Sequence, residues 1–100
     1  MRIGAPEDAI LAVQNNLANT YARLGRLEEA AEMDQNIYRG NLKLNGEENS
    51  NTLTAANNYA NDLLRLDHFE EAKSLLRKMM PVARRVLGES NDLTLRMRTN

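Results

Sequence analysis

The sequence predicts an all-α protein built from two repeated helical hairpins and the first helix of a third. Residues 11–52 and 53–94 align without a gap and are identical at 14 of 42 positions, which marks an internal repeat. Apolar residues recur at helical spacing within each copy. The chain has neither an alternating strand pattern nor a long linker rich in Gly, Pro or Ser. These three observations together indicate stacked helical hairpins.

In the first copy, the pattern predicts helices over residues 8–24 and 27–44. The apolar stripe of the first helix follows i, i+1, i+4 and i+7, as one face of a helix requires, and consists of Leu17, Ala18, Tyr21 and Leu24. Gly25 supplies the turn between the two helices. The apolar face of the second helix consists of Leu27, Ala30, Met33, Ile37 and Leu44.

In the second copy, the same pattern predicts helices over residues 50–66 and 69–87, and a fifth helix begins over 91–99. The equivalent apolar stripe of its first helix is Tyr59, Ala60, Leu63 and Leu66, and that of its second helix is Phe69, Ala72, Leu75, Met79 and Val86. Asp67 takes the turn position, which aspartate tolerates. "GEENSNTL" and "GESNDLTL" close the two copies, because glycine ends a helix and Asn, Ser or Asp caps the next one.

We expect one domain over residues 1–100, with repeats at about 11–52 and 53–94 and a partial third repeat at 95–100. Helical repeat arrays generally need about three units and a polar cap to be stable alone. Two readings follow from this shortness. The chain is a part of a longer array, or it covers its ends by self-association.

Bulk composition excludes several functional classes. The formal net charge is −1, so no overall charge directs the chain to nucleic acid. There is no cysteine, which excludes disulfides and thiolate sites and fits a reducing compartment. No apolar run approaches the roughly 20 residues that a membrane helix needs. We therefore expect a cytoplasmic protein that contacts neither nucleic acid nor membrane.

Catalysis is not expected. His68 is the only histidine, and it falls in a corner between helices. The acidic pairs Glu28/Glu29 and Glu70/Glu71 lie in the first turn of a helix, where acids complement the helix dipole. No cluster of metal ligands and no phosphate-binding glycine loop is present. We expect no enzyme activity, no metal and no cofactor, and loss of turnover on removal of His68 is the observation that would revive the enzyme hypothesis.

The segments "NNLANTYARLGRLEEAAEM" and "NNYANDLLRLDHFEEAKSL" resemble tetratricopeptide repeats. The 42-residue period and the pattern "NNLA…Y…G…EEA…LG" are similar to the kinesin-light-chain type of this repeat. The resemblance implies a right-handed α-α superhelix in which small residues, such as Ala18 with Ala30 and Ala60 with Ala72, let antiparallel helices approach. It also implies a protein-interaction function, with the first helix of each hairpin lining a groove.

A polar stripe recurs on the two first helices beside the packing stripe. Its members are Asn15, Asn16, Asn19 and Arg23 in the first copy and Asn57, Asn58, Asn61 and Arg65 in the second. Amides suit the backbone of an extended peptide, and arginine suits carboxylates. Arg96 falls at the repeat position of Ala12 and Thr54. The resemblance therefore implies that an extended, and acidic, peptide of a partner protein crosses these residues.

Two alternatives remain open at the sequence level. The repeated asparagines could hydrogen-bond between neighbouring helices and hold the stack in register, with Asn16 and Asn58 structural and Asn19 and Asn61 facing a partner. The repeats could also act as spacer or self-assembly units that form homo-oligomers through exposed terminal helices and bind no peptide.

Overall fold

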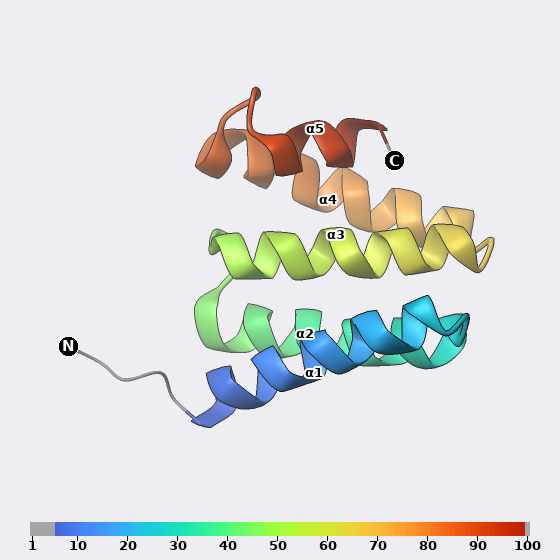
Figure 1. Cartoon of the computed structure of the whole chain (residues 1–100). Coiled ribbons are helices and arrows are strands. Elements are labelled where there is room, and N and C mark those ends of the chain that lie inside the picture. Colours follow the sequence, from blue (N-terminus) through green and yellow to red (C-terminus); the bar gives the residue numbers. More distant parts are fainter. Residues whose placement is uncertain (1–5, 100) are drawn as a thin grey trace.

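The computed structural model of the chain describes residues 6–99, which form five α-helices and no strand. The helices are α1 (Pro6–Arg23), α2 (Leu27–Asn45), α3 (Ser50–Arg65), α4 (Phe69–Leu87) and α5 (Asp92–Thr99). Figure 1 shows them stacked in chain order, from blue α1 to red α5. The expected all-α class is confirmed. The parts of the expected domain at residues 1–5 and 100 lie outside the described residues.

Consecutive helices pack on one another throughout the described chain. α1 packs on α2, α2 on α3, α3 on α4 and α4 on α5, and α3 makes a smaller contact with α5. α3 is therefore covered on two sides, whereas α1 packs on α2 alone. The hydroxyl of Thr94 in α5 is buried and donates to the backbone carbonyl of Ala83 in α4, at 3.4 Å. This bond ties the fifth helix to the stack.

The two tight turns inside the hairpins have the same geometry. Gly25 has φ +79° and Asp67 has φ +63°, so both residues adopt the left-handed conformation that ends many helices. The backbone N–H of Arg26 donates to the carbonyl of Tyr21 at 2.9 Å, and that of His68 donates to Leu63 at 2.8 Å. The expectation that an aspartate can replace the turn glycine is confirmed.

The junctions between hairpins are also built alike. Gly46 and Gly88 follow the ends of α2 and α4 with positive φ. The side-chain oxygen of Asn49 then accepts from the backbone N–H of Asn51 at 2.8 Å, and Asn91 accepts in the same way from Leu93 at 2.9 Å. Each asparagine thus caps the next first helix, as the sequence indicated.

The core lies between the helices and is lined by small residues at the close approaches. Ala18 and Ala30 are buried, and so are Ala60 and Ala72, in agreement with the expected small-residue pairs. Larger residues fill the gaps between hairpins: Leu53, Met79 and Met97 are fully buried. The rings of Tyr38 in α2 and Tyr59 in α3 stack with centroids 6.5 Å apart.

The expected packing stripe of α1 is wrong at two positions. Leu17 is 41% exposed and Leu24 is 66% exposed, although both were expected to pack. The equivalent residues of the second repeat, Tyr59 in α3 and Leu66 directly after it, are half-buried. The ring of Tyr59 stacks on Tyr38 of α2. α1 has no helix on the corresponding side within the described residues, so the same stripe meets solvent there.

Helix ends account for the remaining exposed apolar side chains that were expected in the core. Leu44, Phe69 and Val86 are all exposed, and each lies in the first or last turn of its helix.

None of the helices within residues 6–99 combines the length and hydropathy needed to cross a bilayer. The same residues contain no group of three or more acidic or histidine side chains placed to hold a metal ion.

Candidate functional site

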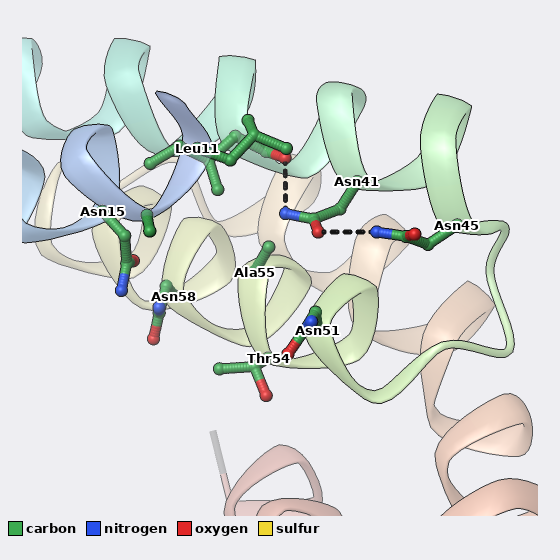
Figure 2. A pocket seen from close by; sticks show the side chains of 10 residues that line it. Leu11, Asn15, Asn41, Asn45, Asn51, Thr54, Ala55 and Asn58 are labelled. Carbon is green, nitrogen blue, oxygen red and sulfur yellow. Dashed lines mark hydrogen bonds between the residues drawn. The ribbon is translucent and has the colours of Figure 1, made fainter. Parts of the chain in front are cut away.

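A cavity of about 320 Å³ opens between α1, the end of α2 and the start of α3. We call it the amide cavity, because half of its lining residues are asparagines. The lining consists of Leu11, Ala12, Asn15, Ile37, Asn41, Asn45, Asn51, Thr54, Ala55 and Asn58. Figure 2 shows these side chains converging from the three helices.

The wall formed by α2 is held by a relay of hydrogen bonds. The side-chain amide of Asn45 donates to Asn41 Oδ1 at 3.2 Å, and the Asn41 amide donates to the backbone carbonyl of Ile37 at 3.0 Å (Figure 2). Asn41 is only 7% exposed. Spacing of four residues along a helix brings such side chains together, so the relay fixes the orientation of this wall.

Gly40 lets α1 approach α2 closely beside the cavity. A Cβ atom at this position would lie 2.8 Å from Leu11 Cδ2, which is closer than carbon atoms approach. The equivalent residue of the second repeat is Val82, which is buried. In the first repeat, the lack of a side chain at Gly40 therefore makes room for Leu11, which forms part of the cavity lining.

Three amides of the cavity are available to a ligand. The side chains of Asn15, Asn51 and Asn58 form no hydrogen bond with other described residues. Thr54 uses its hydroxyl proton on the carbonyl of Ser50 at 3.0 Å, which leaves the lone pairs of its oxygen. The cavity thus presents both donors and acceptors beside the apolar side chains of Leu11, Ile37 and Ala55.

The sequence-predicted asparagines do not all lie together. Asn15 and Asn58 line the amide cavity. Asn16 and Asn19 are exposed on α1, and Asn61 is half-buried on α3. Asn57 is 3% exposed. Asn57 is the repeat partner of Asn15, and the two differ because α3 packs between two helices whereas α1 packs on one.

The asparagines of the polar stripe also differ in their surroundings. Asn58, which the sequence offers with Asn16 as a structural residue, lines the amide cavity, whereas Asn57 is buried, which suits a structural role between helices. Residues of the polar stripe that are identical in the two copies therefore differ in burial and in their neighbours.

The predicted arginines lie away from the cavity. Arg65 Nη1 lies 3.7 Å from Asp62 Oδ1, and Arg96 Nη2 lies 2.8 Å from Asp92 Oδ2. Arg23 is exposed in the last turn of α1. None of the three lines the amide cavity, and no lining residue carries a charge.

Sequence reasoning missed Asn41, Asn45 and Asn51 as site residues. Their repeat equivalents are Ala83, Leu87 and Leu93, so a search for repeated polar positions passes over them. The signal that could have found them is local: Asn41 and Asn45 are spaced by one helical turn at the end of the second predicted helix, directly before the junction that brings the next helix back.

A second cavity, of about 340 Å³, lies between α4 and α5. Apolar and basic side chains share its lining, which consists of Lys73, Leu76, Arg77, Met80, Pro81, Arg84, Met97 and Arg98. The equivalent surface of α2 is covered by α3, where Tyr59 stacks on Tyr38. The described part of α5, which ends at Thr99, leaves the surface of α4 open there.

Comparison with known proteins identifies the repeat. The Tetratricopeptide repeat family model matches residues 9–85. A solved structure, that of BtubC (BKLC) from P. vanneervenii, superposes with a TM-score of 0.81 at 25% identity. The match covers 97% of this chain and 38% of that chain. That protein is a kinesin light chain-like repeat protein, in agreement with the expected repeat type.

A search among curated proteins found no match. This chain spans 38% of the length of the BtubC chain, so the likeness concerns the repeats and not the whole of that protein. Tetratricopeptide repeats form helical solenoids that serve as protein-interaction scaffolds. With a family match over most of its length and this superposition, the chain belongs to the tetratricopeptide repeat family.

Proposed function

We propose that the chain is a non-catalytic interaction module that binds an extended peptide segment of a partner protein at the amide cavity. The observation that carries the proposal is the set of three amides, Asn15, Asn51 and Asn58, which have no hydrogen-bond partner among the described residues and converge from two first helices on one hollow. An extended peptide has one donor and one acceptor at each residue. Amides satisfy both kinds of group.

The rigidity of the site favours binding. The capped helices, the Asn45–Asn41 relay and the seated Leu11 hold the lining in place before a ligand arrives. A preorganised site loses little conformational entropy on binding. The exposed Asn16 and Asn19 and the half-buried Asn61 would extend the contact along the first helices, beyond the cavity.

An acidic preference of the peptide stays a prediction. It depends on Arg23, Arg65 and Arg96, and two of these arginines already pair with an aspartate of their own helix. Such pairing lowers the electrostatic gain from a partner's carboxylate. The proposal therefore depends on the amides alone. A cytoplasmic location likewise stays a prediction.

The test is partner capture from a lysate of the source cell, with Asn15→Ala/Asn58→Ala beside the native chain. We expect the native chain to capture a partner that the double variant loses while its helicity and melting temperature are retained, because alanine favours helix. Asn36→Ala, at an exposed position of α2 outside the cavity, is the matched control and should capture as the native chain does. Equal capture by the double variant and the native chain would contradict the proposal.

A second candidate function is self-assembly, which the exposed stripe of α1 supports. Ile10, Val13, Leu17 and Leu24 are 56%, 65%, 41% and 66% exposed. Their spacing of three, four and seven residues is that of a helix-pairing seam. The equivalent positions of α3 include Thr52 and Ala55, which are buried. A second copy of the chain would cover this stripe with its own α1.

Sedimentation equilibrium separates the two functions. Self-assembly predicts a concentration-dependent dimer that Val13→Glu abolishes and Asn15→Ala/Asn58→Ala leaves intact. A native chain that stays monomeric across the concentration range excludes self-assembly and leaves peptide binding as the function.

A further inference from the structure

We infer that the amide cavity selects an uncharged amide side chain of the partner peptide, that of Asn or Gln, and rejects a carboxylate. This selectivity deepens the proposed function and rests on it, since it names the chemical class that the same cavity accepts. It differs from the acidic preference that the arginines of the sequence suggested.

Hydrogen-bond complementarity is the first reason. The side chains of Asn15, Asn51 and Asn58, unpaired among the residues that the structure describes, each offer an N–H₂ group and a carbonyl oxygen. A carboxylate accepts only, and an ammonium group donates only. An amide uses both kinds of partner at once, so it leaves the fewest lining groups unpaired. A ligand that leaves polar groups of the lining without a hydrogen bond binds more weakly than one that pairs them all.

The fixed wall of α2 adds a second reason. Asn45 donates to Asn41, and Asn41 donates to the carbonyl of Ile37. This orientation leaves the carbonyl oxygen of Asn45 without a donor among the described residues. An acceptor at the wall of the cavity attracts an amide N–H₂ group and repels a carboxylate oxygen.

The absence of charge in the lining is the third reason. None of the ten lining residues is charged, and the arginines of the polar stripe, Arg23 and Arg65, are not among them. Part of the lining, including Asn45, Asn51 and Thr54, is exposed, so a carboxylate that enters the cavity gives up part of its hydration and gains no ion pair. A neutral amide loses much less hydration. The difference in desolvation alone favours the amide.

Size limits the ligand to a short element. A cavity of about 320 Å³ is at the lower end of the range of about 300–1,000 Å³ for ligand sites. It accommodates one side chain with its adjoining backbone. Selectivity should therefore appear at one position of a bound peptide, with its neighbours less constrained.

The experiment is a selection from a displayed library of random dodecapeptides on the native chain and on Asn15→Ala/Asn58→Ala. We expect the native chain to enrich peptides with Asn or Gln at one aligned position and the double variant to lose them. Replacing that residue with Asp or Glu in a synthetic copy should weaken binding by about tenfold or more. The Kd is measured by fluorescence polarisation, and circular dichroism verifies that both proteins are folded.

The two possible failures look different. Enrichment of Asp or Glu at the aligned position, lost in the double variant, would overturn the selectivity and leave the proposed function standing. Enrichment of no peptide by the native chain over the double variant would overturn both.

A charge introduced into the cavity gives a second, independent readout. Asn58→Lys places an ammonium group in the lining, at a half-buried position. Its selection should shift from Asn or Gln towards Asp or Glu at the aligned position. Asn36→Lys carries the same charge at an exposed site of α2 outside the cavity and should leave the selection unchanged. An unchanged preference in Asn58→Lys would show that the cavity does not read this residue and would overturn the inference.

Discussion

Asp34 of α2 and Asp62 of α3 face each other in the interface between the two hairpins, and both are buried, at 6% and 3% exposure. Asp62 Oδ1 lies 3.7 Å from Arg65 Nη1, whereas Asp62 Oδ2 has no hydrogen-bond partner among the described residues. A proton on Asp34 supplies that missing donor. Burial, and then the hydrogen bond with Asp62, raise the pKa of Asp34 to about 8.

The first prediction is that stability falls as the pH rises towards 8. The pKa of Asp34 is higher in the folded protein than the value of about 3.9 in an unfolded chain, so the folded state binds more protons between these values. Stability contributed by the neutral carboxyl is present below about pH 4 and is lost as the pH rises through about 8. Urea unfolding from pH 5 to pH 9 should show midpoints that decrease. A flat profile would contradict the shared proton.

The second prediction separates this proton from the other titrating groups. Asp34→Asn keeps the shape of the neutral carboxyl and supplies a donor at every pH, so its stability should exceed that of the native chain at pH 9. The gain should shrink at pH 5. Asp92→Asn, which removes an exposed carboxylate paired with Arg96, is the control and should leave the pH profile of unfolding nearly unchanged. A profile for Asp34→Asn parallel to that of the native chain would assign the pH dependence to other residues.

The third prediction concerns the aromatic contact at the same interface. The Tyr38 ring stacks on Tyr59, and its hydroxyl donates to Met79 Sδ at 3.6 Å. Tyr38→Phe keeps the ring and loses a weak hydrogen bond, so it should cost less than about 1 kcal/mol. Tyr38→Ala removes a buried ring and should cost about 3 kcal/mol or more of the free energy of unfolding. Equal costs in chemical denaturation would show that the hydroxyl, and not the ring, holds the hairpins together.

The fourth prediction uses Gly40 to change the cavity without unfolding the chain. Gly40→Ala places a Cβ within 2.8 Å of Leu11 Cδ2, and the flexible end of Leu11 must move. The strain is offset by about 1 kcal/mol of helix propensity, so the melting temperature should change by a few degrees at most. Peptide binding at the cavity should weaken, because Leu11 lines it. A large loss of stability would show instead that Leu11 cannot move.

The repeat pattern predicts the helices and turns well because they depend on local sequence. The two turn residues, the asparagine caps and the close-packed alanines all follow from residue types at fixed spacing. The covered side of each helix does not follow, since it depends on the next helix along the stack. Leu17 and Tyr59 therefore differ in exposure although they occupy the same repeat position.

The site was only half predictable for a related reason. A repeat comparison finds what the two copies share, and it found Asn15 and Asn58, which line the amide cavity. The Asn41–Asn45 relay occurs only in the first copy, and the Asp34–Asp62 pair joins the two copies through residues that neither copy repeats. The repeat equivalents of Asn41 and Asn45 are Ala83 and Leu87, and those of Asp34 and Asp62 are Leu76 and Thr20. A comparison of the two copies therefore does not find these residues.

The last prediction exchanges the turn residues of the two hairpins. Asp67 adopts φ +63° and Gly25 adopts φ +79°, and a left-handed conformation costs an L-residue roughly 1–2 kcal/mol, less for aspartate. Asp67→Gly relieves this strain but adds freedom to the unfolded chain. The net effect should be a stabilisation of about 0.5–1 kcal/mol. Gly25→Asp should destabilise it by a similar amount. Chemical denaturation measures both, and Asp67→Ala, which lacks the local hydrogen bonding of aspartate, should be the least stable at that position. If Asp67→Gly lowers stability instead, the aspartate side chain contributes a contact that outweighs the backbone strain.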